Sequence, residues 1–451
     1  MLPKFISKYL HTRFRLIPYL IVKKSLIFIR TIFVLILVPL LLLVALISRT
    51  TRTSSINRKP KILFGIDGII NDSYFASSLK ENYLSISVTR RVFNINTKND
   101  FDLVTGTGVM KSIYYSFFFL FKYDIFHLSF NGGFISVIGL KKLEPIIYKL
   151  AGIKTVIYAY GADVSLYDKM LNPAYVHTVL SHYPVTLKRK IDIENQIKKW
   201  SKFGNIILPA MFAGNGFFRW DLVMPNSLVI DTKNISPNKN KRKSNSIKIV
   251  HTPNHTIIKG TDFLIKAVSE LKQEGLNVEL IIIHGKQNKE VLDILINEAD
   301  ILVEKLIGPS YALSGIEGMA CGLPVISNIN TPDWSNYMKL FYRYSFLNEC
   351  PILSSNPETI KDILKILCMN EELRVKLGES GRKYVEKYHS FNTSNFVFGK
   401  IYEKIWYEKD VDLMNLFNPL NPDSYNNQSP LINHPLVENK IPKELMVKLN
   451  K

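Results

Sequence analysis

The stretch SGIEGMACGLPVIS, Ser314–Ser327, decides the fold prediction because it joins a short helix to a buried strand. Ser314 stands where a helix N-cap is expected, and Glu317 follows three residues later. Gly322 then ends the helix, and Pro324 opens the apolar strand. The Ser-x-x-Glu pattern leaves two interpretations of the glutamate: it closes a helix end, or it binds a ligand there.

Short apolar segments alternate with longer helical stretches from residue 61 onward, which predicts parallel sheets covered by helices. The apolar segments are KILFGI, YDIFHLSF, KTVIYAYG, IKIVHTP, VELIIIHG, ADILVEK and PVIS. A polar, basic linker over 231–246 divides them into two groups. We therefore predict an α/β fold of two doubly wound, Rossmann-like domains, 60–230 and 247–408, that face a cleft. The Asn- and Pro-rich residues 409–451 predict an extended or disordered polar tail.

The N-terminal part of the chain carries a membrane signal. The first sixty residues hold eleven Lys and Arg residues and no acidic residue, and an uncharged run of 18 residues lies between Arg30 and Arg49. This run is long enough to cross a bilayer, so we predict a basic segment over 1–25 and a transmembrane or re-entrant anchor over 26–48. Basic residues flank both ends, so they do not choose an orientation, but they favour contact with anionic lipids. Because the sheets begin at residue 61, we expect the domains to fold without residues 1–58.

Nucleic-acid and metal binding are not predicted, although the formal net charge is +20. The basic cluster around residues 239–248 lacks aromatic residues and is typical of a solvated linker. The candidate metal ligands lack the spacing of a metal site: Cys321, Cys350, Cys368, His251, His255 and His284.

A diphosphate site is predicted in the second domain. Lys259 and Gly260 follow the strand IKIVHTP and precede an amphipathic helix that begins near Thr261. A lysine beside the free amide groups of a helix N-terminus suits a diphosphate, although a surface lysine would give the same pattern. The segment GPSYALSG leads into the helix of Glu317 and supplies a second set of amide groups. The residues predicted to contact the nucleotide are Gly260, His284, Gly285, Ser314 and Gly315.

Acceptor-side residues are predicted at strand ends of the first domain. His127 ends the strand YDIFHLSF, Asn131 opens the following turn, and Asp163 follows the strand KTVIYAYG. His127 is a candidate for the chemistry, with a structural histidine as the alternative. Asp163 is either an acceptor-side residue or a helix cap.

Three segments resemble the family 4 retaining glycosyltransferases of the GT-B fold: HTPNHTIIKGTDFLIKAV, ADILVEKLIGPSYALSGIEGMACGLPVIS and the region from Cys350 to Ser390. The resemblance covers roughly Ile247–Ile405, and the first domain matches in outline. It implies that Lys259 binds the donor diphosphate and that Glu317 anchors the donor ribose. It also implies a nucleotide-diphosphate sugar as donor, no further cofactor and no metal, with the leaving phosphate able to take the acceptor's proton.

Two positions depart from the family pattern. Pro309 stands where a second glutamate commonly touches the transferred sugar, and Asn254, His255 and Thr256 replace the arginine that commonly precedes the lysine. These departures favour an alternative function, a membrane-tethered nucleotide-sugar-binding or scaffold protein without turnover. A nucleotide-sugar epimerase on the same fold would need paired acids and bases that the sequence does not show.

The resulting prediction is a membrane-anchored glycosyltransferase. It would move a sugar to a hydroxyl of a glycan or lipid-linked acceptor, with retention, in surface polysaccharide or glycolipid synthesis. The cytosolic supply of nucleotide sugars favours catalytic domains on the cytosolic side of a bacterial inner membrane. Its partners would be the nucleotide sugar, the acceptor and the membrane.

Overall fold

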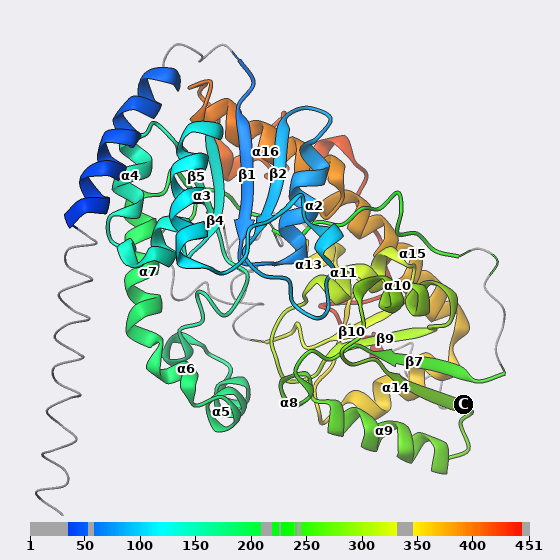
Figure 1. Cartoon of the computed structure of the whole chain (residues 1–451). Helices are drawn as coiled ribbons and strands as arrows, with labels where there is room; N and C mark the ends of the chain where they lie inside the picture. The colour runs from blue at the N-terminus through cyan, green and yellow to red at the C-terminus, as the bar shows by residue number, and fades with distance from the viewer. Residues whose placement is uncertain are drawn as a thin grey trace, which may run out of the picture.

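The computed structural model describes residues 35–52, 58–208, 219–224, 227–238, 240, 245–331 and 346–443. Two parallel sheets with flanking helices form its two domains (Figure 1). The first sheet has six strands in the order β3 (Leu103–Val104), β2 (Leu84–Thr89), β1 (Lys61–Ile66), β4 (Ile125–Ser129), β5 (Lys154–Tyr158) and β6 (Ile206–Ile207). The second has five, in the order β11 (Leu353–Ser354), β10 (Val325–Ser327), β9 (Ile301–Lys305), β7 (Ile247–His251) and β8 (Val278–Ile282).

The connections between strands are helical in both domains. Those of the first domain are α2 (Ile70–Leu79), α3 (Val109–Lys122), α4 (Glu144–Leu150), α5 (Pro173–His182), α6 (Val185–Lys188) and α7 (Lys190–Phe203), with short turns η1 (Lys98–Asp100), η2 (Ser136–Leu140) and η3 (Tyr167–Lys169). Those of the second are α8 (Thr256–Lys259), α9 (Thr261–Gln273), α10 (Asn288–Asn297), α11 (Leu313–Ala320) and α13 (Phe346–Glu349). The helices α14 (Ile360–Met369), α15 (Glu371–Tyr388) and α16 (Phe391–Ile405) follow the last strand, β11. The prediction of two doubly wound α/β domains in the GT-B arrangement is confirmed.

The strand and helix patterns follow from burial. Every residue of β9 is buried, as expected for a central parallel strand covered on both faces. Helix α9 buries Leu264, Ala267, Val268 and Leu271, which recur at three- and four-residue spacing along one face. The strand order reverses between β1 and β4 in the first sheet and between β7 and β9 in the second. Ligands of such sheets bind beyond the carboxyl ends of the strands at these reversal points.

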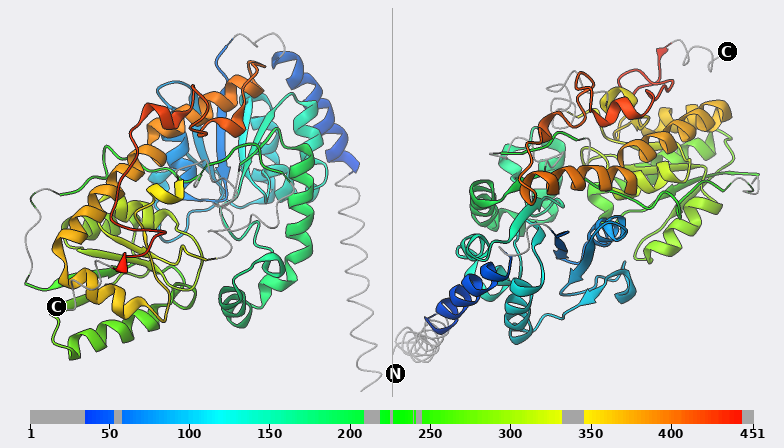
Figure 2. Two further views of the ribbon diagram at one scale, coloured as in Figure 1. Left: turned by 180° about the vertical axis from the view of Figure 1, so that it is seen from behind. Right: turned by 90° about the horizontal axis from the view of Figure 1, so that it is seen from above.

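Helix α16 returns the chain from the second domain to the first, where it packs on α2. The Oγ atoms of Ser78 and Ser394 lie 2.8 Å apart, and Trp406 Nε1 donates to the Arg58 carbonyl at 3.0 Å. In Figure 2 the C-terminal part, coloured orange to red, runs over both domains.

The C-terminal segment corrects one expectation. Residues 409–443 contain two short turns, η5 (Leu413–Asn415) and η6 (Tyr425–Gln428), and otherwise little regular structure. They are nevertheless packed, because seven of their apolar side chains are buried in the protein core: Leu413, Leu416, Phe417, Tyr425, Ile432, Leu436 and Ile441. The expectation of an extended or disordered tail is therefore wrong for this part of the chain.

The predicted anchor is described from residue 35. An 18-residue helix over Leu35–Arg52, with a mean hydropathy of 1.8, is apolar and long enough to cross a membrane, and it continues four residues beyond the predicted end at residue 48. Residues 1–34, including the predicted basic segment, lie outside the described residues. Leu37, Leu41 and Ala45 join the core of the first domain, and Arg52 pairs with Asp124 at 3.4 Å. The segment therefore packs on the first domain, and folding of the domains without residues 1–58 stays a prediction.

Candidate functional site

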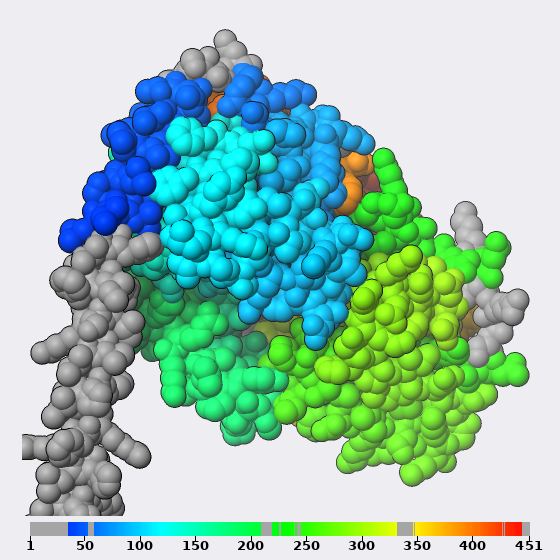
Figure 3. All heavy atoms as spheres, in the orientation of Figure 1, coloured from blue at the N-terminus to red at the C-terminus, as the bar shows by residue number. Residues whose placement is uncertain are grey.

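The carboxyl ends of the two sheets face each other. The loop after β2 accepts a hydrogen bond from the second domain, because the Asn288 amide N–H donates to the Ile95 carbonyl at 3.2 Å. The segment between α5 and α6 reaches the loop after β7, where Tyr183 Oη lies 3.2 Å from His255 Nδ1. Figure 3 shows the two domains in contact along this side. Side chains at both reversal points therefore lie toward the same region between the domains.

A buried cluster of charges lies at the reversal point of the second sheet. Lys259 Nζ lies 3.4 Å from Glu304 Oε1, and Lys305 Nζ lies 3.6 Å from the same oxygen. Burial lowers the pKa of Lys305 to about 8, although Glu304 opposes this change. Burial alone would raise the pKa of Glu304, but the charges of Lys305 and Lys259 hold it below its usual value. With all three groups ionised, the cluster has one more positive than negative charge.

Gly260 sets the direction of the chain beside this cluster. It has φ of 75° and joins α8 to α9, which begins at Thr261 as predicted. A Cβ atom at Gly260 would lie 3.0 Å from Leu306 Cβ, so both its conformation and its surroundings require glycine. His251 connects the start of α9 to β9, because its Nε2 lies 2.9 Å from Thr261 Oγ1 and its Nδ1 lies 2.7 Å from the Val303 carbonyl oxygen.

Helix α11 starts differently from the sequence prediction. Its N-cap is Ala312, so Ser314 lies inside the helix and the predicted capping box is wrong. The buried Glu304 carboxylate binds the start of the helix instead, because its Oε1 accepts a hydrogen bond from the Ala312 N–H at 2.9 Å. A Cβ atom at Gly315 would come within 2.6 Å of Glu304 Oε2, which explains the glycine there. The preceding Ser310 has φ of 68°, an uncommon conformation for a residue other than glycine.

Glu317 lies on the buried side of α11. Its side chain accepts a hydrogen bond from Asn288 Nδ2 at 2.7 Å, and the residue is 3% exposed. Burial raises the pKa of Glu317 to about 7; Asn288 and Lys259 oppose the rise, and Glu304 adds to it. The carboxylate thus shares its electrostatic surroundings with the lysine cluster. The capping interpretation is excluded by the helix start, and the ligand interpretation remains a prediction.

Two further predicted nucleotide contacts lie beyond β8. His284 is exposed and its Nδ1 lies 2.8 Å from the Pro253 carbonyl, and Gly285 has φ of 71°. Burial lowers the pKa of His255, and the charges of Lys259 and His284 add to this effect. His284, His255 and Lys259 therefore belong to one electrostatic neighbourhood.

His127 corrects another expectation. It lies in the middle of β4, is 0% exposed, and its Nε2 lies 2.8 Å from Tyr402 Oη on α16. Its ring stacks on Phe64 at a centroid distance of 4.1 Å. Burial lowers the pKa of His127 well below its usual value, so the ring is a neutral core group. The expected position at a strand end in the cleft is wrong.

Asp163 and Asn131 do lie at the carboxyl edge of the first sheet. Asp163 is buried and accepts backbone N–H groups from Phe130, Tyr160 and Gly161 at 3.2, 3.1 and 2.9 Å, so it fixes two neighbouring loops. Burial raises the pKa of Asp163 to about 7. Asn131 Nδ2 donates to Tyr160 Oη at 2.9 Å.

Asp67 is an acidic residue that the sequence analysis missed. It directly follows β1 at the reversal point of the first sheet and accepts a hydrogen bond from Ser129 Oγ at the end of β4. Burial raises the pKa of Asp67, although hydrogen bonds from Ser129 and Asn131 oppose the rise. Its place in GIDG, directly after the apolar strand KILFGI, was the available signal. Lys305, at the end of ADILVEK, was missed as well.

Comparisons with known proteins agree with this architecture. No protein-family model matches the chain. A curated protein of Methanocaldococcus jannaschii, described as an uncharacterized glycosyltransferase, is 22% identical over 315 residues, covering 58% of this chain and 84% of that protein.

Two solved structures match much of this chain at TM-scores below 0.5. S. aureus MnaA in complex with UDP is 14% identical, with a TM-score of 0.46 and coverage of 76% of this chain and 97% of that one. The catalytic domain of Arabidopsis thaliana starch synthase IV bound to ADP and acarbose is 8% identical, with a TM-score of 0.42 and coverage of 78% and 99%.

Proposed function

We propose that this protein is a GT-B glycosyltransferase that uses a nucleotide-diphosphate sugar as donor. The observation that carries the proposal is the buried pair of cations, Lys259 and Lys305, beside Glu317 at the reversal point of the second sheet. A departing diphosphate develops negative charge, which two lysines stabilise, and the carboxylate accepts hydrogen bonds from ribose hydroxyls. The similarity to the curated glycosyltransferase supports the same assignment.

Lys305 offsets one departure from the family pattern. The missing arginine before Lys259 would leave one cation at the diphosphate, but Lys305 brings a second ammonium group to the same carboxylate. A diphosphate bound near Glu304 would meet a cluster with one excess positive charge, which favours an anion there. We propose that the two lysines together take the place of the usual arginine and lysine.

The finer parts of the proposal concern the reaction and its setting. Transfer proceeds with retention and without metal, the acceptor hydroxyl approaches from the first domain near Asp67 and Asn131, and the leaving phosphate takes its proton. The acceptor is a glycan or lipid-linked sugar of a surface polysaccharide or glycolipid, and the catalytic domains lie on the cytosolic side of the membrane to which the N-terminal helix attaches them. Pro309, where the family commonly has a glutamate, favours the alternative of nucleotide-sugar binding without turnover.

Calorimetric titration with UDP, ADP and GDP, followed by incubation with the matching nucleotide sugars, tests the proposal. Lys259→Ala and Lys305→Met should each weaken binding of the accepted nucleotide by about 1 to 3 kcal/mol, the value of a hydrogen bond to a charged group. Lys266→Ala, on the exposed side of α9, is the matched control and should bind normally. Because the pKa of Lys305 is about 8, binding should weaken as pH rises through 8 in the native protein and lose that dependence in Lys305→Met.

The outcomes separate the functions. Transfer or hydrolysis of a nucleotide sugar supports the transferase, whereas binding without turnover supports the alternative. Interconversion of free or nucleotide-linked epimers would identify an epimerase. If both lysine variants bind every nucleotide as tightly as the native protein, the proposed diphosphate site is wrong.

A further inference from the structure

The N-terminal helix lies along the first domain instead of projecting from it. Its buried residues recur every three to four positions and are Leu37, Leu41, Ala45, Ser48 and Arg52. They cover 15 residue steps, or about 22 Å at 1.5 Å per residue, which is most of the described helix. Figure 3 shows the helix, in dark blue, packed along the side of the domain. One face of the helix therefore packs on the first domain, and the opposite face is exposed.

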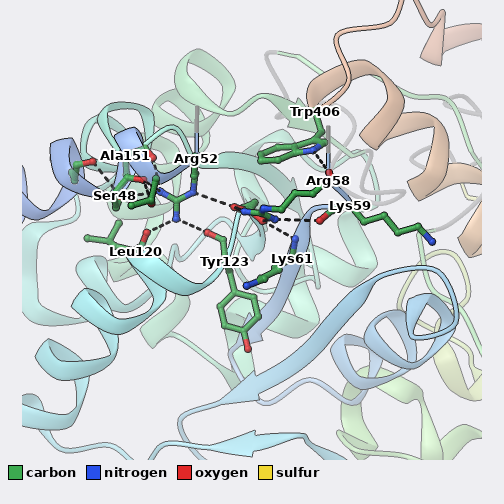
Figure 4. A network of polar contacts seen from close by, with 12 residues as sticks. Ser48, Arg52, Arg58, Lys59, Lys61, Leu120, Tyr123, Ala151 and Trp406 are labelled. Atoms are coloured by element: carbon green, nitrogen blue, oxygen red, sulfur yellow. Dashed lines mark hydrogen bonds and ion pairs between the residues drawn. The ribbon is translucent and has the colours of Figure 1, made fainter. Parts of the chain in front are cut away.

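Arg52 fixes the C-terminal end of the helix on the domain. Its guanidinium donates to the carbonyl groups of Ala151 at 2.6 Å and Tyr123 at 2.7 Å, and to that of Leu120 (Figure 4). Asp124, whose side chain is 2% exposed, pairs with Arg52 at 3.4 Å and with Arg58 at 2.6 Å. Because this end is tied into the domain, residues 37–52 in this arrangement cannot thread a bilayer.

The outward face of the same helix is apolar. Ile36, Leu40, Leu43 and Ile47 follow one another at three- and four-residue spacing and are 67%, 46%, 54% and 48% exposed. A helix with one apolar face, flanked by cations, lies in the interfacial plane of a membrane instead of crossing it. The exposed row therefore suits contact with acyl chains while the buried row keeps the domain at the surface.

A basic cavity opens beside the C-terminal end of this helix. It has a volume of about 430 Å³, and its lining includes Arg49, Arg52, Lys149, Lys154 and Lys202, with Glu408 as the acidic residue. Lys154 begins β5, so the cavity lies at the starting edge of the first sheet, opposite the carboxyl edge where the lysine cluster of the second domain is directed. The cavity and the proposed nucleotide site are thus separate.

We infer that the first domain rests on a membrane surface with helix Leu35–Arg52 in the interface, and that the basic cavity holds the phosphate group of an anionic phospholipid. Arg52 is paired with Asp124, so the other four cations of the lining, Arg49, Lys149, Lys154 and Lys202, supply the charge complementarity against the carboxylate of Glu408. The adjacent apolar row places acyl chains next to the cavity. The cavity opens at the end of the helix, where headgroups lie beside an interfacial helix. The inference does not depend on the nucleotide site, because the cavity lies at the starting edge of the first sheet and the nucleotide site lies in the second domain.

The full chain in mild detergent, titrated with dioctanoyl phosphatidylglycerol or dioctanoyl phosphatidylcholine and monitored by native mass spectrometry, tests the inference. The native protein should prefer phosphatidylglycerol. Lys154→Gln combined with Lys202→Gln should weaken phosphatidylglycerol binding by about 25-fold, since each cation contributes roughly fivefold near an anionic lipid surface. Phosphatidylcholine binding and nucleotide binding should stay unchanged, and the latter also reports that the variant is folded.

A matched control separates a defined site from general attraction by a basic protein. Lys142→Gln combined with Lys188→Gln removes the same charge from exposed positions that do not line the cavity, and it should leave the preference intact. An equal loss in both pairs, or no loss in either, would overturn the inference. So would saturable binding of inorganic phosphate without a preference between the lipids, which would identify a soluble anion as the occupant. A concentration-dependent dimer that buries the apolar row would likewise overturn it and assign that face to a second copy.

Discussion

Replacing Glu317 with glutamine should make the protein more stable at neutral pH while impairing donor binding. The pKa of Glu317 is about 7 in the folded protein, against an ordinary value of 4.5. Burial therefore favours the neutral form, so the contribution of Glu317 to folding stability is fully present below pH 4.5 and is lost as pH rises through 7. The difference corresponds to about 3 kcal/mol at about 1.36 kcal/mol per pKa unit. Glutamine is neutral at every pH and can still accept the hydrogen bond from Asn288 Nδ2.

The expected result is a pair of stability curves that coincide at low pH and diverge as pH rises. Urea denaturation at pH 4 should give similar free energies of unfolding for both proteins, and at pH 8 the variant should be more stable by about 3 kcal/mol. Transfer should fall by roughly tenfold to a hundredfold, because the amide replaces a carboxylate that accepts from sugar hydroxyls. Glu279→Gln, exposed on β8, makes the same chemical change and should alter neither quantity.

Stability and activity together decide the role of this residue. A variant that gains no stability at pH 8 would show that Glu317 is ionised at little cost in the folded protein, which would refute the reasoning from burial. A variant that gains stability and transfers sugar normally would refute the ligand role alone. If it loses stability at every pH, the carboxylate has a structural partner beyond Asn288.

Two further predictions concern the fold. Gly260→Ala should lower the free energy of unfolding by at least about 1 to 2 kcal/mol, because alanine disfavours positive φ and its Cβ would press on Leu306; an unchanged urea midpoint would contradict this. Deleting residues 1–58 should destabilise the first domain by about 3 to 5 kcal/mol, because it removes both arginine partners of Asp124 together with the packed side chains of Leu37, Leu41 and Ala45. Full stability of the shortened chain in a thermal scan would count against this role of the segment.

The fold could be predicted because its central strands are long, apolar and regularly spaced. The segments KILFGI and ADILVEK became β1 and β9 with little change in boundaries. The strands that the pattern did not reveal are the two-residue strands β3, β6 and β11 and the partly polar β2, which reads LSISVT. Short or polar strands give no clear alternation, so tertiary pairing alone identifies them.

The site could be predicted less completely, because its residues depend on partners that are distant in sequence. Lys259 and Glu317 carry a local signal, a helix start and a family motif. Glu304 and Lys305 carry none, since an acidic and a basic residue at a strand end usually face solvent; the packing of α8 on β9 is what buries them. His127 failed for the opposite reason, because α16 covers its face of the sheet 275 residues later.

The same long-range packing determines which parts of the chain move together. Helix α16 is attached to the first domain through Ser394, Tyr402 and the following Trp406, although it follows the second domain in sequence. The chain therefore crosses between the domains near Ile230 and near His389, and these two crossings are paired, because Ile230 N–H donates to the His389 carbonyl at 2.8 Å. The C-terminal segment then returns to the second domain, where Asn439 Nδ2 donates to the Cys350 carbonyl at 2.7 Å. A change in the angle between the domains must be absorbed at these adjacent crossings and in the C-terminal segment, since the contacts of α16 resist it elsewhere. A rotation there would move the lysine cluster relative to Asp67, and it would change the contacts of Asn288 with Ile95 and of Tyr183 with His255 between the domains.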